Sequence, residues 1–337
     1  MKKSISLILL YSFLCLTILP TWSAHANTSM VENKMEDRKQ LFDHMSTVTH
    51  IPWYYFAAVD QYERNTSNQK KKREITQTEE YKKRITAIHI PLQAWYGAMN
   101  LMQTKQSESN VMLFNGIGRD GDGDGLVDHH NDMDVVTTMA SIISKHGTSD
   151  SDMMRGLWDY YQNDRIMKRI TQLAAIYRHF DMIQLEGNAF PVPLHANYSY
   201  RSTWGASRGW GGRRIHEGTD IFANHGVTVR STSYGIVEEK GWNRFGGWRI
   251  GIRDVKGIYH YFAHLNGFEK SLEEGSIVKP GDTIGWVGSS GYGKPGTQGK
   301  FPPHLHYGMY KDNGYIDWSF DPYPYLRKWE RQERKRR

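Results

Sequence analysis

Residues 258–264 read Ile-Tyr-His-Tyr-Phe-Ala-His, a short run rich in β-branched and aromatic residues that follows Gly257. Side chains on a strand alternate between its two faces, so this composition and its turn boundary predict a half-buried strand. Similar runs, each bounded by turn residues, start at Gly235, Trp248 and Thr283. We therefore predict an antiparallel β-sheet in the C-terminal half of the chain.

The residues before Gly187 show a different period. From Leu41 to Gln184 the apolar side chains recur every three to four positions, and Val135, Met139 and Ile142 form one such stripe. This spacing is typical of amphipathic helices. The predicted fold class is therefore multidomain α + β, with a helical half followed by an antiparallel β half.

Length and composition agree with this division. The chain has 337 residues, of which 39% are hydrophobic and 11 are tryptophan, so it is long and apolar enough for two folded domains and is not intrinsically disordered. We place the helical domain at residues 27–186 and the β domain at residues 187–325.

The N-terminus reads as a secretory signal over residues 1–26. Lys2 and Lys3 precede an apolar run from Ile5 to Leu19, and Ala24-His25-Ala26 offers a small-residue cleavage site. The run is shorter than the roughly 20 residues that a membrane-spanning helix needs. We expect a secreted protein that starts at Asn27 and keeps no stable membrane span. The alternative is a membrane anchor through an uncleaved N-terminal segment.

The positive charge is concentrated at the C-terminus. Residues 327–337 contain seven lysines and arginines against Glu330 and Glu333, while the whole chain carries a formal charge of +7. We predict a basic tail over residues 326–337 that contacts anionic polymers of a cell wall, and a merely solvated tail is the alternative. We expect no nucleic-acid partner.

Two short motifs in the β half contain metal-ligating residue types. His216 and Asp220 lie four positions apart, and His304 and His306 lie two apart. On an extended chain both spacings return the side chains to one face. Two histidines and one aspartate with an open fourth position are what a catalytic zinc site needs. Taken alone, each motif also fits an ordinary surface pair.

The residues around these motifs resemble the lysostaphin or LytM-type zinc metallopeptidases, which cut peptides of the bacterial wall. The resemblance covers residues 190–324, in matching order and spacing. Its motifs are Phe190-Pro-Val-Pro-Leu, Arg214-Ile-His-Glu-Gly-Thr-Asp-Ile, Tyr261-Phe-Ala-His-Leu, Val278-Lys-Pro-Gly-Asp-Thr-Ile-Gly-Trp-Val-Gly and Pro303-His-Leu-His-Tyr-Gly.

The resemblance implies a role for five residues. It makes His216, Asp220 and His306 the zinc ligands, and it makes His264 and His304 the unligated catalytic histidines. Zinc would polarise the scissile carbonyl and acidify a water molecule, while the two histidines would move a proton or stabilise the developing oxyanion. His260 falls outside the motif, and we interpret it as an exposed strand histidine.

The helical half resembles the lysozyme-like domain of soluble lytic transglycosylases over residues 51–178. The resemblance places Glu63 on the catalytic acid and Gln103 on a substrate-lining glutamine. Arg64, Asn100-Leu101 and Tyr161 depart from the family pattern, and an adjacent arginine would favour the ionised form of Glu63. Glycan cleavage through Glu63, glycan binding and a purely structural role therefore all remain open.

An acidic loop in the helical half has the spacing of an EF-hand. Position twelve of such a loop falls on Asn131, so the usual bidentate glutamate is missing. We weigh a calcium site against a solvated acidic turn. The candidate ligands are Asp120, Asp122, Asp124 and Asp128.

Together these observations predict a secreted zinc endopeptidase that cuts stem peptides of peptidoglycan and contacts its glycan. Within the family, the chain resembles the LytH-type L-Ala–D-Glu endopeptidases of spore-forming bacilli, which implies the cell wall or the spore cortex as its location. The alternatives are a lytic transglycosylase acting through Glu63 and a non-catalytic scaffold that binds the wall.

Overall fold

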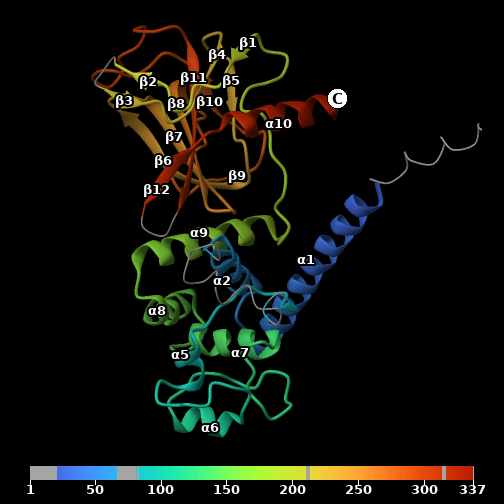
Figure 1. The fold of residues 1–337 in the computed structure, drawn as a ribbon. Helices are drawn as coiled ribbons and strands as arrows, with labels where there is room; N and C mark the ends of the chain where they lie inside the picture. Colours follow the sequence, from blue (N-terminus) through green and yellow to red (C-terminus); the bar gives the residue numbers. More distant parts are fainter. Residues whose placement is uncertain (1–20, 67–80, 82, 210–212, 313–315, 337) are drawn as a thin grey trace, which may run out of the picture.

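The computed structural model describes residues 21–66, 81, 83–209, 213–312 and 316–336, with side chains from residue 34 onward. The predicted signal at residues 1–26 lies outside the described residues, apart from the backbone of 21–26. Within the described ranges, no helix is both long and apolar enough to cross a membrane. The chain forms a helical half and a β half, and helix α9 lies between the sheet and helices α5, α6, α7 and α8 (Figure 1).

The helical half contains seven described helices. Asparagine and serine side chains cap α7, α8 and α9 by accepting hydrogen bonds from backbone N–H groups in the first turn. The helices are α1 (Thr21–Thr49), α2 (Trp53–Thr66), α5 (Leu92–Tyr96), α6 (Glu108–Leu113), α7 (Asp132–Ile143), α8 (Asp150–Tyr161) and α9 (Asp164–Phe180).

The helical pattern from Met153 to Phe180 is divided into two helices, which the sequence period did not indicate. Gln162 adopts a left-handed conformation with φ of 46° and ends α8, and the side chain of Asn163 then caps α9. Large side chains such as Phe56 and Trp95 fill the core between these helices and are fully buried. The helical prediction for this half is confirmed.

The β half is built on one large antiparallel sheet, as predicted. Its strand order is β1-β4-β11-β8-β7-β6-β9, and β10 and β12 pair with β8 and β11 respectively, while β5 pairs with β10. The strands are β1 (Tyr198–Tyr200), β4 (Thr219–Ala223), β5 (Thr228–Arg230), β6 (Gly235–Asn243), β7 (Gly247–Asp254), β8 (Ile258–Phe268), β9 (Ile277–Val278), β10 (Thr283–Val287), β11 (His304–Asp312) and β12 (Asp317–Phe320).

A separate two-stranded hairpin, formed by β2 (Ser207–Arg208) and β3 (Arg214–Ile215), precedes β4. The register of the large sheet brings the two metal-ligand motifs together. His306 on β11 lies directly opposite Asp220 on β4, and on its other side it pairs with Ala263 of β8, the residue before His264.

The segment predicted as a basic tail is part of the β half. Residues 323–335 form helix α10 (Tyr323–Lys335), and its Leu326 and Trp329 are 0% and 4% exposed in the core of this half. The lysines and arginines of α10 all lie on its exposed side. Leu326 and Trp329 lie on one face of the helix, and because that face is buried, the opposite face with the basic side chains is exposed to solvent.

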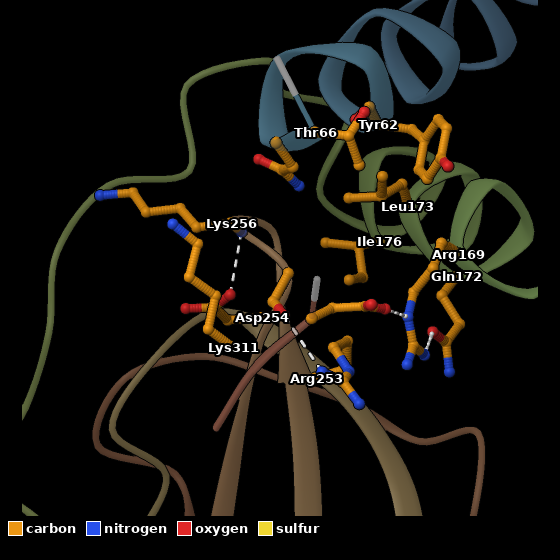
Figure 2. Close-up of a pocket in the computed structure, with 13 residues that line it drawn as sticks. Tyr62, Thr66, Arg169, Gln172, Leu173, Ile176, Arg253, Asp254, Lys256 and Lys311 are labelled. Atoms are coloured by element: carbon orange, nitrogen blue, oxygen red, sulfur yellow. Dashed lines mark hydrogen bonds and ion pairs between the residues drawn. The ribbon is translucent and has the colours of Figure 1, made fainter. Parts of the chain in front are cut away.

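The two halves meet through a network of buried charges. Arg169 of α9 donates to Asp312 of β11 (Nε to Oδ2, 3.0 Å) and to Glu238 of β6 (Nη1 to Oε1, 2.8 Å). Arg253 of β7 also binds Glu238 (2.8 Å). Figure 2 shows the small cavity here, with Arg169 and Gln172 on α9 facing Arg253 on the sheet; its volume of about 30 Å³ has room for about one water molecule.

Candidate metal centre

Three side-chain atoms from distant parts of the chain converge at one point of the β half. His216 Nε2 lies 3.0 Å from Asp220 Oδ1, His306 Nδ1 lies 3.0 Å from the same oxygen, and the two nitrogens lie 2.9 Å apart. All three are atoms that bind cations through a lone pair. The structure therefore assembles the donor set that the sequence predicted for zinc.

His216 reaches this point from a connecting segment rather than from a strand. β3 ends at Ile215 and β4 begins at Thr219, so the expectation that His216 and Asp220 share one extended strand is wrong. The backbone oxygen of Thr203 instead fixes the ring, because it lies 2.9 Å from His216 Nδ1. That contact places the proton on Nδ1 and leaves the lone pair of Nε2 facing Asp220 and His306.

Asp220 is kept ionised by its neighbours. Burial alone would raise the pKa of its carboxyl group, but the close contacts with the imidazole rings of His216 and His306 outweigh burial and hold the pKa far below the ordinary value. Arg208 of β2 also contacts Asp220 Oδ2. A fully ionised carboxylate is the form that binds a metal ion.

His264 and His304 lie beside the three ligand-type residues, with their ring centroids 4.8 Å apart. His264 Nδ1 faces the backbone oxygen of Ser290 (2.8 Å), and His304 Nδ1 faces that of Pro302 (2.9 Å). In each ring the Nδ1–H therefore donates to a carbonyl, and Nε2 retains a lone pair.

Burial keeps both of these rings neutral. It lowers the pKa of His264 to about 3, with the neighbouring His304 and His306 adding to the effect. Burial also lowers the pKa of His304, partly opposed by Asp220. A neutral imidazole at neutral pH is able to accept a proton.

The backbone at His264 is unusual. Its φ of 62° is in the left-handed region, which costs a residue other than glycine on the order of 1–3 kcal/mol. Its N–H donates to Gly246 O (2.7 Å), and this bond together with the Ser290 contact holds the conformation. Such strain is common where a side chain must be aimed at a functional site.

The cluster opens into a cleft with a volume of about 460 Å³. The β2–β3 hairpin forms a polar wall of this cleft, and the β6–β7 turn and the β10–β11 segment form aromatic walls. Strands β8 and β11 form its floor. The residues that line it are Arg208, Arg214, Ile215, His216, Glu217, Asp220, Asn243, Phe245, Gly246, Tyr261, His264, Tyr292, Phe301, His304, His306 and Tyr310. An extended peptide therefore has access to the three converging donors.

Residues 214–318 match the family model described as peptidase family M23. Over 299 residues the chain is 52% identical to the L-Ala–D-Glu endopeptidase of Bacillus subtilis strain 168. This alignment covers 89% of this chain and 90% of that protein. The chain belongs to peptidase family M23. Members of this family are zinc-dependent metallopeptidases, so the prediction of a peptidase is confirmed.

Two further matches to this M23 peptidase are shorter. Lysostaphin of Staphylococcus staphylolyticus is 34% identical over 115 residues, which is 34% of this chain and 22% of that protein. The solved lytM structure from Ruminococcus gnavus ATCC 29149 is 40% identical, covers 55% of this chain and 74% of that one, and has a TM-score of 0.40.

Glu63, the candidate acid of the helical half, lies near the end of α2 with 3% of its surface exposed. The Tyr161 hydroxyl donates to its Oε1 (3.1 Å). Two residues later, Asn65 donates to the backbone oxygen of Val255 (3.0 Å), so this end of α2 abuts the β7–β8 turn of the M23 peptidase half. Arg64 forms an ion pair with Asp60 (3.3 Å). Gln103 is exposed.

His260 corrects one sequence interpretation, because it is 1% exposed rather than a surface residue. Its Nδ1 lies 2.6 Å from the Tyr307 hydroxyl, and its Nε2 lies 3.1 Å from Asp254 Oδ2. The ring of Trp329 covers this face of β8 at a centroid distance of 6.4 Å. The pattern of β8 alone did not reveal that a later helix packs there.

The acidic loop of the helical half does not have the predicted ligand arrangement. The carboxylates that converge within 4.8 Å are those of Asp120, Asp122 and Asp134. Asp124 instead forms an ion pair with Lys105 (2.7 Å), because the fold brings this lysine next to its carboxylate. Calcium binding remains a prediction without support from this geometry.

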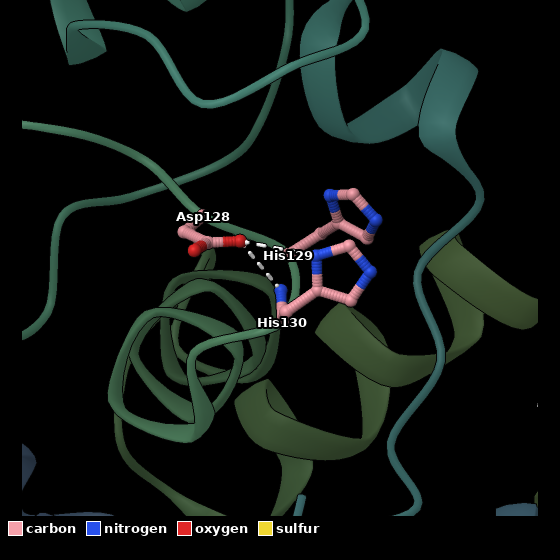
Figure 3. A group of neighbouring side chains, drawn as sticks. All are labelled: Asp128, His129 and His130. Atoms are coloured by element: carbon pink, nitrogen blue, oxygen red, sulfur yellow. Dashed lines mark hydrogen bonds and ion pairs between the residues drawn. The ribbon is translucent and has the colours of Figure 1, made fainter. Parts of the chain in front are cut away.

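Asp128, the fourth predicted calcium ligand, belongs to a different cluster that the sequence analysis missed. Its carboxylate lies with His129 and His130, whose rings stand side by side (Figure 3), and ligand atoms of the three residues lie within 4.8 Å of one another. Tyr96 contacts His129 Nδ1 (3.0 Å), and burial lowers the pKa of His129 to about 4. The consecutive residues Asp-His-His at positions 128–130 are the sequence pattern that could have indicated this cluster.

Proposed function

We propose that this protein is a secreted zinc endopeptidase that hydrolyses the L-Ala–D-Glu bond in stem peptides of peptidoglycan. The observation that supports the site most directly is the convergence of His216 Nε2, Asp220 Oδ1 and His306 Nδ1 at 2.9–3.0 Å beside two neutral imidazoles. The bond is proposed from the name of the B. subtilis relative, which the chain matches over 89% of its length.

The donor set fits zinc. Two imidazole nitrogens and one carboxylate oxygen are a common protein ligand set of catalytic zinc, and the second nitrogen of His216 is oriented by a backbone carbonyl, as metal-bound histidines usually are. We propose His216, Asp220 and His306 as the ligands. Zinc supplies Lewis acidity and lowers the pKa of a bound water molecule.

His304 and His264 are the proposed catalytic histidines. Because their Nδ1–H groups donate to Pro302 O and Ser290 O, each Nε2 has a lone pair that is able to take the proton of the attacking water. Once protonated, the same nitrogen donates a hydrogen bond to the developing oxyanion or returns the proton to the leaving amine. We assign the proton transfer to His304 first, with His264 as its partner.

The location and further contacts belong to the proposal as well. We propose export through residues 1–26, action at the cell wall or spore cortex, and contact of the exposed basic face of α10 with anionic wall polymers. The helical half would bind glycan. Charge on one exposed helix face suits a polyanion, since such binding needs little shape complementarity.

Two other functions compete with this proposal. Glycan cleavage through Glu63 is disfavoured, because a side chain that is 3% exposed offers no access for a glycosidic oxygen. A non-catalytic scaffold is disfavoured by the complete set of donors and by the open cleft around them.

Mass spectrometry of purified peptidoglycan after incubation separates the three functions. Our proposal expects new peptide termini between L-Ala and D-Glu with wild type and with Glu63→Gln, and none with His306→Ala. Anhydro-sugar ends that disappear in Glu63→Gln would favour the transglycosylase, and unchanged peptidoglycan would favour the scaffold.

A further inference from the structure

The β2–β3 hairpin carries two arginines directly opposite each other. Arg208 pairs with Arg214 in the antiparallel register, and both side chains line the cleft. Like charges at directly opposed positions destabilise a strand pair. The strand pairing alone does not favour this arrangement, so the two arginines are placed by what they contact in the cleft.

Arg214 is held in a fixed orientation at the cleft wall. Its guanidinium carbon lies 5.4 Å from the centroid of Phe245 and 5.5 Å from that of Tyr292, and its Nη2 donates to the Tyr292 hydroxyl. Aromatic contacts restrain the planar group, and its five N–H donors lie in the plane of the fork. Tyr292 in turn lies 6.2 Å from His264, ring centroid to ring centroid, so Arg214 stands close to the proposed catalytic residues.

Arg208 shows that this hairpin reaches a carboxylate inside the cleft, because its Nη2 contacts Asp220 Oδ2. In the described lining, these two arginines balance the carboxylates of Glu217 and Asp220. A divalent cation bound by Asp220 would make the cleft net positive. An anionic group on the substrate is therefore the chemistry that the cleft favours.

We propose that Arg208 and Arg214 form a binding site for the free carboxylate of the substrate's glutamyl residue. This inference rests on the proposed L-Ala–D-Glu cleavage. A glutamyl residue within a peptide keeps one free carboxylate, whichever of its two carboxyl groups forms the next bond, and it directly adjoins the scissile bond. Arginine binds carboxylate through paired, charge-assisted hydrogen bonds. The substrate class is therefore stem peptides whose glutamyl carboxylate is unmodified.

Two synthetic stem peptides test this inference, one with the free glutamyl carboxylate and one with the corresponding carboxamide. The zinc-loaded wild type should cleave the acid with a kcat/KM at least about 10-fold higher than the amide, mainly through KM, because a charge-assisted pair is lost in the amide. Arg214→Gln should reduce this ratio towards one. Arg214→Lys, which keeps the charge without the fork, should give an intermediate ratio.

The control is Arg213→Gln, since Arg213 is the adjacent arginine but is exposed and is not part of the described cleft lining. It should keep the wild-type acid-to-amide ratio. Equal cleavage of both peptides by wild type, or an unchanged ratio in Arg214→Gln and Arg214→Lys, would overturn the carboxylate site while leaving L-Ala–D-Glu cleavage intact. Cleavage of neither peptide by wild type would instead overturn the proposed function, and this inference with it.

Discussion

His216 Nε2 and His306 Nδ1 lie 2.9 Å apart, although 90 positions separate the two residues in the sequence. The contact of His216 Nδ1 with Thr203 O leaves Nε2 without a proton, and Asp220 Oδ1 adds a negative charge 3.0 Å away. Three electron-rich atoms this close repel one another unless a cation or a proton lies between them. The arrangement thus suits a bound metal ion.

We expect His306→Ala and Asp220→Ala each to abolish zinc binding and peptide cleavage, because each removes one of three proposed ligands. Zinc content of the purified proteins, measured together with cleavage, tests this. His225→Ala is the control, since that histidine is exposed and outside the cleft lining, and it should retain both. Full zinc content in either ligand variant would remove that residue from the set.

His304→Ala should keep its zinc but lose most of its turnover, by a factor of about 10²–10⁴ in kcat. The residue is not one of the converging donors, since its Nε2 lies 3.8 Å from Asp220 Oδ1. Kinetics and metal content measured on the same sample separate a catalytic role from a ligand role. If turnover stays within a few-fold of wild type, the proton transfer belongs to His264 instead.

Much of the fold was predictable from local patterns. Alternation and turn residues located the strands around His264 and Thr283, because side-chain period and glycine boundaries are local properties of the chain. The donor set of His216, Asp220 and His306 was predicted from the resemblance to the zinc metallopeptidases, since each short motif alone also fits an ordinary surface pair.

Features that depend on distant contacts were not predictable. We interpreted His260 as exposed because the residues near it in the sequence do not indicate that Trp329 packs against its strand. Asp124 was assigned to calcium from the EF-hand spacing of its loop, whereas the fold pairs it with Lys105, which lies 19 positions earlier. The left-handed backbone of His264 is another case, since Ser290 and Gly246 hold it from other strands and turns.

Arg169→Met should destabilise the whole protein by about 1.5–3 kcal/mol, because Glu238 and Asp312 each lose one charge-assisted hydrogen bond while keeping other cationic partners. The Arg169 side chain is 9% exposed, while those of its partners Asp312 and Glu238 are 15% and 6% exposed. Arg178→Met on the same helix is the matched control, since its side chain is 67% exposed and its ion pair spans 3.7 Å. That variant should lose at most about 1 kcal/mol.

Urea unfolding of the metal-free proteins measures both variants of α9. Equal stability of Arg169→Met and Arg178→Met would mean that the charge network between the two halves adds nothing to folding.

Glu238 predicts how the protein responds to acid. Burial would raise the pKa of its carboxyl group, but Arg253 and Arg169 outweigh burial and lower the pKa to about 2. A lowered pKa means that the ionised carboxylate stabilises the fold above the ordinary value near 4.5, and that this contribution disappears as the pH falls from there through 2. From that shift, the contribution is about 3 kcal/mol.

In Glu238→Gln this pH-dependent contribution is absent, so its free energy of unfolding should fall less steeply than that of wild type between pH 4.5 and 2. Groups such as His129 titrate alike in both proteins and cancel in the comparison. Urea unfolding of both metal-free proteins across this range measures the difference. Parallel curves would show that Glu238 has the same pKa in the folded and unfolded states, and that its ion pairs with Arg169 and Arg253 do not stabilise the fold.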